Sequence, residues 1–204
     1  MFGKLAADAL GLSDIGTVIK AEDYNKVDSD DYVMHEDQEK IYFLIKSKKD
    51  EYCFTNTALI HLDGNSAISK KRMLRRLSYV KNPITDVYLE TAGTVDMDIE
   101  IKFVMGGATY SIDVHKKHIE EVKDLYKTLF RISEITRDNE ISFEHARVSL
   151  EHATQAIGRN SSGAPTPAES FKEIAQAANG WLSSAQQKYV QKDFAAVFER
   201  YIHN

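Results

Sequence analysis

Residues 97–115 read MDIEIKFVMGGATYSIDVH, and this stretch decides the fold class of the chain. Apolar residues hold every second position from Met97 to Met105, and charged residues hold most positions between them. The alternation resumes from Tyr110 to Val114, beyond the Gly-Gly pair. Successive side chains of a strand point to opposite faces of a sheet, and glycine adopts the positive φ angles of a tight turn. The stretch therefore predicts an antiparallel hairpin with one buried face and one solvated face.

Runs of β-forming residues precede this hairpin and extend the sheet. They are separated by turn signals, above all Asp63-Gly64 and the break at Pro83. The predicted strands cover residues 41–45, 52–55, 58–62, 73–80 and 84–90. Together with the hairpin they predict an antiparallel β barrel or sandwich of about seven strands. Residues 1–12 have the spacing of a short amphipathic helix, and the polar, acidic residues 13–40 predict a solvated loop.

The hydrophobic period changes to that of an α-helix at about His115. Because this first helix follows the last strand directly, we expect it to cap the β domain. A break in this helix is expected near residues 136–139, where Asp138 or Asn139 is placed to cap a new helix. A linker rich in Gly, Ser and Pro follows at about 158–168, and Pro167 opens a final helix with an aromatic stripe.

The pattern predicts an α+β protein with two domains. Residues 1–137 form the β domain with its N-terminal and capping helices, and residues 138–204 form an α-helical hairpin extension. A two-helix hairpin has one internal seam, so its other apolar surface must meet the β domain or another copy of the chain. The candidate anchors of an oligomer interface are Trp181, Phe194, Phe198 and Tyr201. The alternative for these aromatic residues is packing within the chain, on the β domain.

Three segments carry a resemblance to a known family. They are FTN at 54–56, SKK at 69–71 and above all ETAGTVDMDIE at 90–100. These segments resemble the bacterial pleckstrin-homology (PH) family, and the chain is most similar to its YvbH-type members from Gram-positive bacteria, which share the opening LSDIG at 12–16. The resemblance implies a seven-stranded PH-like barrel closed by the helix after His115. It also implies a C-terminal helical oligomerisation extension and ring-like or higher homo-oligomers, but neither an enzyme nor phosphoinositide binding.

The composition narrows the classes of function. The chain of 204 residues has a formal net charge of −5 and a pI near 5.8, which argues against nucleic acid as a partner. Its single cysteine, Cys53, excludes an intramolecular disulfide and lies in an apolar run, which predicts a packing role. No leader and no apolar segment of membrane-spanning length is visible, so we expect a cytoplasmic protein.

The sequence contains no motif that demands a reaction. Hydrolase, zinc-protease, P-loop and dinucleotide-binding signatures are absent from it. The pair His115 and His118 is too small a ligand set for a structural zinc ion. The alternating Asp98 and Glu100 fit the wet face of a strand better than acid–base chemistry. We therefore expect no enzymatic activity, no cofactor and no metal site.

A basic cluster stands out in this acidic chain. Its cations lie close together in the sequence and are Lys70, Lys71, Arg72, Arg75 and Arg76. One interpretation is a site for anionic phospholipid or a phosphate ligand at the membrane surface. The other is ion pairing with acidic residues such as Glu90 or Asp96, within the sheet or across a subunit interface.

Two functions remain after these exclusions. The leading prediction is a non-enzymatic interaction module of undefined biological role. We expect it to form a homo-oligomer through both domains, and other proteins are further candidate partners. The alternative is an adaptor that makes peripheral contact with an anionic membrane through the basic cluster.

Overall fold

The computed structural model describes residues 14–64, 72–91, 98–159 and 167–203. The expected helix over residues 1–12 lies outside these ranges. The chain forms two compact units. The β unit comprises residues 1–134 together with 192–204, and the helical unit comprises residues 135–191. The C-terminal residues thus belong to the β unit, whereas the division expected from the sequence assigned everything after residue 137 to the extension.

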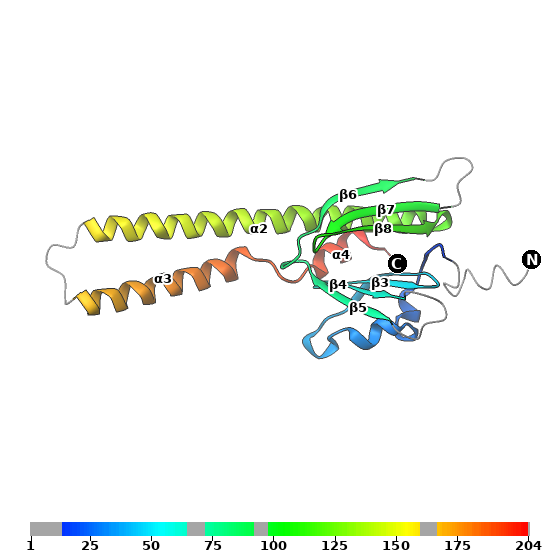
Figure 1. Cartoon of the computed structure of the whole chain (residues 1–204), viewed down its shortest axis with the longest axis horizontal. Helices are drawn as coiled ribbons and strands as arrows, with labels where there is room; N and C mark the ends of the chain where they lie inside the picture. Colours follow the sequence, from blue (N-terminus) through cyan, green and yellow to red (C-terminus); the bar gives the residue numbers. More distant parts are fainter. Residues whose placement is uncertain (1–13, 65–71, 92–97, 160–166, 204) are drawn as a thin grey trace, which may run out of the picture. The chain divides into compact units, whose positions relative to one another are not determined.

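The described part of the β unit contains two antiparallel sheets, which face each other (Figure 1). The five-stranded sheet has the order β1 (Thr17–Val18), β2 (Ile41–Lys46), β3 (Asp50–Thr55), β4 (Ala58–Asp63) and β5 (Met73–Ser78). The three-stranded sheet has the order β6 (Thr85–Glu90), β7 (Asp98–Met105) and β8 (Ala108–His115). The two sheets match the antiparallel β barrel or sandwich expected from the sequence. They contain one strand more than expected, because the two-residue β1 is too short to leave a sequence pattern.

The hairpin predicted at residues 97–115 is confirmed as β7 and β8. Met105 pairs with Ala108, and the turn between them uses Gly106 and Gly107 at φ angles of 59° and 76°. The inward-facing residues Ile99, Ile101, Phe103, Met105, Tyr110, Ile112 and Val114 are buried. The Phe103 ring lies 6.3 Å from that of Phe54 in the opposite sheet. The alternating pattern therefore supplies one face of the core between the sheets.

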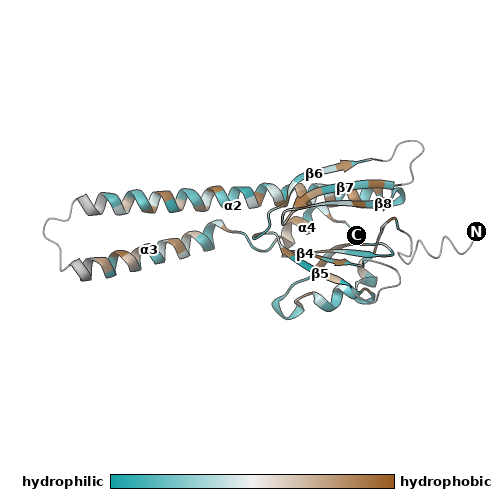
Figure 2. Ribbon diagram, viewed as in Figure 1, coloured by the Kyte–Doolittle hydropathy of each residue, from teal (hydrophilic) through white to brown (hydrophobic). Residues whose placement is uncertain are grey.

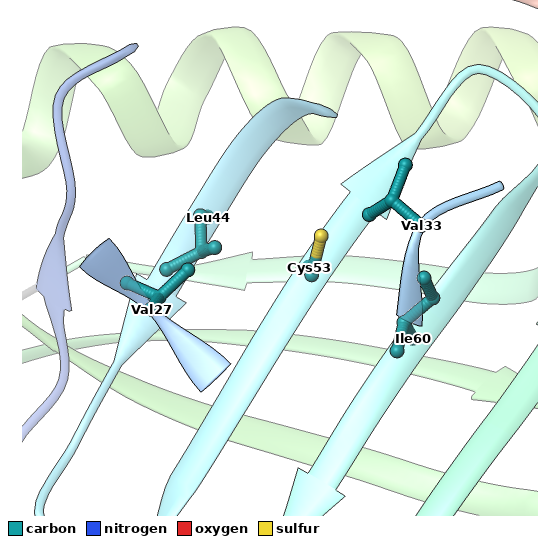
Figure 3. Close-up of a cluster of buried hydrophobic side chains, with 5 residues drawn as sticks. All are labelled: Val27, Val33, Leu44, Cys53 and Ile60. Atoms are coloured by element: carbon teal, nitrogen blue, oxygen red, sulfur yellow. The ribbon is translucent and has the colours of Figure 1, made fainter. Parts of the chain in front are cut away.

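The segment expected to be a solvated loop is instead ordered against the five-stranded sheet. It forms three 3-10 helices, η1 (Ala21–Lys26), η2 (Asp28–Tyr32) and η3 (His35–Asp37). Two of its residues are buried with side chains from β2, β3 and β4, and Figure 3 shows this cluster of Val27, Val33, Leu44, Cys53 and Ile60. The predicted packing role of Cys53 thus has a physical basis. The sheet is apolar on both faces because one face meets the opposite sheet and the other meets this segment.

The helices differ from the expectation in two places. Helix α2 (Ile119–Arg159) continues without a break through residues 136–139. A polar residue there did not end the helix, because no Gly or Pro occurs between residues 119 and 157 to interrupt its hydrogen bonding. The expected single final helix is divided into α3 (Pro167–Tyr189) and α4 (Ala195–Tyr201).

The division between α3 and α4 is made by contacts with the β unit. Asp193 accepts a hydrogen bond from the backbone nitrogen of Ala195 at 2.7 Å, at the start of α4. Its other carboxylate oxygen accepts one from the side-chain amide of Asn56 at 2.7 Å. The backbone nitrogen of Phe194 donates to the Asn56 carbonyl oxygen at 2.8 Å. These bonds hold Asp193 and Phe194 against Asn56 at the start of α4.

Candidate interaction surfaces

The structure separates the members of the basic cluster. Lys70 and Lys71 lie outside the described residues. Arg72 lies just before β5, and Arg75 and Arg76 lie within it. Arg76 Nη2 is 2.8 Å from Glu39 Oε1. Arg72 Nη1 is 2.6 Å from Asp28 Oδ2. Two of the described cations are therefore neutralised by carboxylates of the same chain.

Glu39 is the centre of the first ion pair and is 2% exposed. Its carboxylate accepts hydrogen bonds from the backbone nitrogen of Met34 at 2.8 Å and from the hydroxyls of Thr55 and Thr57. Burial raises the pKa of Glu39, but these donors and the Arg76 guanidinium outweigh it and lower the pKa to about 2. The carboxylate therefore stays charged and ties η3 to the sheet.

Glu51 anchors η2 in the same way. It is buried on β3 and accepts a hydrogen bond from the backbone nitrogen of Ser29 at 2.9 Å. Burial raises the pKa of Glu51, but hydrogen bonding and charge from Lys46 outweigh this and lower it. Arg72 approaches the same carboxylate at 3.5 Å. Together the two buried glutamates form ion pairs with Lys46, Arg72 and Arg76. Their hydrogen bonds to Met34 and Ser29 hold the segment with the three 3-10 helices against the sheet.

Arg72 and Arg76 thus form ion pairs within the chain. Their partners differ from Glu90 and Asp96, which were expected from the sequence. Among the described residues, Glu90 pairs with Lys102 at 3.0 Å, and Asp96 lies outside the described ranges. The partners Asp28 and Glu39 were missed because they lie in the segment interpreted as a solvated loop, and the third partner, Glu51, lies on β3.

Arg75 is the exception within the cluster. It is exposed, and its guanidinium lies 3.5 Å from the sulfur of Met73. Arg75 forms no ion pair with any described residue. The cluster therefore presents one described cation to solvent in place of a concentrated basic patch.

A hollow of about 500 Å³, the lysine cleft, lies between β1, η1 and the 3-10 helix η4 (Lys116–His118) that precedes α2. Its basic residues are Lys20, Lys26, Lys46, Lys117 and His118. Lys26 pairs with Asp23 at 2.6 Å, and Lys46 pairs with Glu51. Within the described ranges Lys20 and Lys117 form no ion pair, so the cleft has two cations available to a small anion.

The histidine of this cleft is held by neighbours. One ring nitrogen of His118 lies 2.8 Å from the Thr17 hydroxyl, and the other lies 3.1 Å from the Glu121 carboxylate. Burial lowers the pKa of His118 despite the nearby Glu121. Among the residues that the structure describes, no group of three His, Cys, Asp or Glu side chains is placed to hold a metal ion.

Two of the candidate interface aromatics lie in the core of the β unit. Phe194 and Phe198 are fully buried. The Phe194 ring meets Tyr79 edge-on at 5.5 Å, and the Phe198 ring stacks on Tyr42 at 5.1 Å. Tyr201, at the end of α4, is partly buried. Phe194 and Phe198 thus follow the second interpretation, which was packing within the chain on the β domain.

Trp181 is different because it belongs to the helical unit and is 50% exposed. Its indole nitrogen donates to the carbonyl oxygen of Ala146 at 3.2 Å, across the seam between α3 and α2. Beside it lies a second hollow of about 500 Å³, the hairpin groove. Its apolar lining residues are Leu150, Ala153, Ile174, Ala177, Ala178 and Trp181, and the polar Ser149, Thr154 and Glu173 complete the lining. The groove is an apolar surface that the hairpin does not cover.

Comparisons with known proteins find two family regions in the chain, and the second of them includes residues 192–204, which pack in the β unit. Residues 9–133 match the family described as "Bacterial PH domain", and residues 144–204 match the "YvbH-like oligomerisation region". The uncharacterized protein YvbH of Bacillus subtilis (strain 168) is 54% identical over the full length of both chains.

A solved structure is also similar, that of a PH-domain-containing bacterial protein from Exiguobacterium sibiricum 255-15. It has 50% sequence identity and a TM-score of 0.85, and the match covers 93% of this chain and all of the other. Among the residues described here, no helix combines the length and the apolar character needed to cross a membrane.

Proposed function

The chain belongs to the bacterial PH domain family, and from this premise we propose that it is a non-enzymatic interaction module that self-associates through its helical unit. The hairpin groove is the observation that carries the proposal. An apolar surface left open on a two-helix hairpin is stabilised when another element covers it. The oligomerisation region matched at residues 144–204 includes both walls of the groove.

The two units contribute differently to this function. The β unit completes its own core, because Phe194 and Phe198 fill it from the same chain. The helical unit has no comparable aromatic cluster among its described residues, and its large apolar side chains Trp181 and Phe171 are half or more exposed. Figure 2 shows hydrophobic residues at intervals along α3. We therefore assign self-association to the helical unit and not to α4.

The mass of the particle in solution tests the proposal. Light scattering after size exclusion is measured on the full chain and on a variant in which a Gly-Ser linker replaces residues 135–191. This variant keeps residues 192–204, which a simple truncation at residue 137 would remove from the core of the β unit. We expect a multimer for the full chain and a smaller particle for the variant. Equal subunit numbers for two folded proteins would contradict assembly through the helical unit.

The second candidate function is binding of an anionic ligand or membrane surface. The observation that favours it is the lysine cleft, where Lys20 and Lys117 have no acidic partner among described residues, together with the exposed Arg75. Each basic residue near an anionic bilayer contributes about 1 kcal/mol. Co-sedimentation with phosphatidylserine-rich vesicles at low salt is the test. Failure to sediment, with phosphatidylcholine vesicles as the control, would exclude the membrane surface as the anionic partner.

A further inference from the structure

We propose that the lysine cleft and a hollow beside it form one site for a small zwitterion, a molecule that carries both a phosphate group and a primary ammonium group. The phosphate binds in the lysine cleft, and the ammonium binds near carboxylates in the neighbouring hollow. Phosphoethanolamine is the simplest molecule with this chemistry, either free in solution or as the headgroup of a phospholipid. The inference rests on the second candidate function and names the class of ligand for that site.

The two hollows adjoin each other within the β unit. The second hollow has a volume of about 690 Å³ and is called the glutamate hollow, because Glu22 and Glu121 are among its lining residues. The wall that it shares with the lysine cleft consists of Val18, Ile19, Lys20 and His118. With so much of their walls in common, the two hollows can hold the two ends of a single ligand.

The lysine cleft supplies the positive charge of the site. Lys20 lies just before η1 and Lys117 lies in η4, so the fold brings them to one cleft from distant parts of the sequence. Neither forms an ion pair with any residue that the structure describes. Phosphate oxygens accept hydrogen bonds from ammonium groups, and such charge-assisted bonds are stronger than bonds between neutral groups. The two lysines therefore match a phosphate group.

The glutamate hollow supplies the negative charge. Glu22 forms no ion pair within the described part of the chain, and Glu121 is paired there with His118, at 3.1 Å. Burial lowers the pKa of His118 below its ordinary value of 6.5, so the imidazole is mainly neutral at pH 7. The two glutamates thus lack a permanent cation, and a ligand ammonium group can donate hydrogen bonds to them.

Apolar surface lies between the two charged ends. Val18 and Ile19 belong to the shared wall and are half-buried, so they offer contact to the CH2 groups that link phosphate to ammonium. His118 in the same wall is held on both sides, by the Thr17 hydroxyl at 2.8 Å and by Glu121. A wall that is ordered before the ligand arrives reduces the entropy lost on binding.

The balance of charge favours a zwitterion over a simple anion. The charged residues that line the two hollows, histidines aside, are Lys20, Lys26, Lys46, Lys117, Glu22, Asp23 and Glu121. Lys26 pairs with Asp23, and Lys46 pairs with Glu51. Two lysines and two glutamates remain, one pair toward each end. A phosphate alone would match the lysines and leave the carboxylates of the glutamate hollow without a partner.

Calorimetric titration of the full-length protein gives the first test. Phosphoethanolamine is compared with its two fragments, inorganic phosphate and ethanolamine, at equal ionic strength. Because the linked fragments occupy both ends of the site at once, we expect phosphoethanolamine to bind at least about tenfold more tightly than either fragment. Equal affinities for phosphoethanolamine and phosphate would overturn the inference, since the ammonium group would then contribute nothing.

Single substitutions test the two ends separately. Lys117→Gln should weaken the binding of phosphoethanolamine and of phosphate about tenfold, because both lose a charge-assisted hydrogen bond. Glu22→Gln should weaken phosphoethanolamine about threefold and leave phosphate no weaker, because only the ammonium contacts this end. A Glu22→Gln variant that binds phosphoethanolamine as tightly as the wild type would contradict the assigned ammonium end.

Controls accompany these variants. Lys81 is exposed in the turn between β5 and β6 and forms no ion pair with a described residue, so Lys81→Gln removes a matched charge far from either lining and should change neither affinity. Circular dichroism confirms that each variant is folded. Lys20→Gln replaces Lys117→Gln if that variant does not fold, and Glu121→Gln replaces Glu22→Gln.

Vesicles distinguish a lipid headgroup from a soluble ligand. Phosphatidylethanolamine presents a primary ammonium, whereas the quaternary ammonium of phosphatidylcholine has no N–H to donate, so pure phosphatidylcholine vesicles are the control. Sedimentation with phosphatidylethanolamine vesicles that is weaker for Lys117→Gln and Glu22→Gln supports the site with a lipid as its source. Binding of free phosphoethanolamine without sedimentation supports the site with a soluble ligand as its source.

The outcomes separate the inference from the second candidate function. If the folded chain binds phosphate through Lys117 but gains nothing from the ammonium group, the inference fails and binding of an anion in the cleft stands. If the folded chain binds neither phosphoethanolamine nor phosphate, and sediments with neither kind of vesicle, the inference fails and the lysine cleft no longer supports the second candidate function.

Discussion

Replacing Phe198 with alanine should destabilise the β unit severely. Phe198 is fully buried, and its ring contacts Tyr42 at 5.1 Å and Tyr79 at 6.4 Å. Truncating a buried phenylalanine to alanine costs about 3–5 kcal/mol in lost burial and cavity formation. Domains of this size are stable by only about 5–15 kcal/mol, so the change removes a large fraction of the free energy of unfolding.

Urea unfolding followed by circular dichroism measures the effect. Phe171→Ala is the matched control, because Phe171 is 74% exposed in the helical unit and its loss should change the free energy of unfolding by less than about 0.5 kcal/mol. We expect the midpoint of Phe198→Ala to fall while the slope with urea is unchanged. A loss below about 1 kcal/mol for Phe198→Ala would refute the placement of α4 in the core.

Three further predictions concern the buried polar and thiol groups. Glu39→Gln should cost about 2–3 kcal/mol in urea unfolding, because it leaves the partly buried Arg76 without its carboxylate, whereas Glu36→Gln at an exposed position should be nearly neutral. The pKa of Glu39, about 2, lies below its ordinary value of 4.5, so its stabilisation is fully present above pH 4.5 and is lost as the pH falls toward 2. The difference in unfolding free energy between wild type and Glu39→Gln should therefore shrink over that window, and a constant difference would contradict the assigned charge. Burial raises the pKa of the Cys53 thiol, so Ellman's reagent should react with it only after unfolding in urea, and rapid reaction of the native protein would show that the cluster opens.

Much of the β domain could be predicted from local pattern. The alternation from residue 97 to 115 and the Gly-Gly turn depend only on neighbouring residues, and they produced the β7–β8 hairpin. The capping helix followed from its apolar stripe, and its residues Val122, Leu125 and Leu129 are all fully buried. The resemblance carried by residues 90–100 pointed to the same PH-like fold, although the structure does not describe all of that segment.

The candidate site was less predictable, because its contacts join distant parts of the chain. The basic cluster was visible in the sequence, but its partner Glu39 is separated from Arg76 by 37 positions. A carboxylate in a polar segment has no local feature that identifies its cation. Trp181 was correctly placed on the helical hairpin, whereas its role at an interface remains a prediction.

The sequence by itself determined the strands, the turns and the helical stripes, since these arise from periodicity and from the backbone preferences of single residues. Only the tertiary structure decided where the aromatic C-terminal stripe goes. One helical period runs from Phe171 to Tyr201, yet the chain leaves the helix after Tyr189 and returns Phe194 and Phe198 to the β unit. The break lacks glycine and proline and is stabilised by Asn56, a residue 137 positions away from Asp193 in the sequence. Long-range burial and hydrogen bonding outweighed the local helical pattern, and only the folded molecule contains that information.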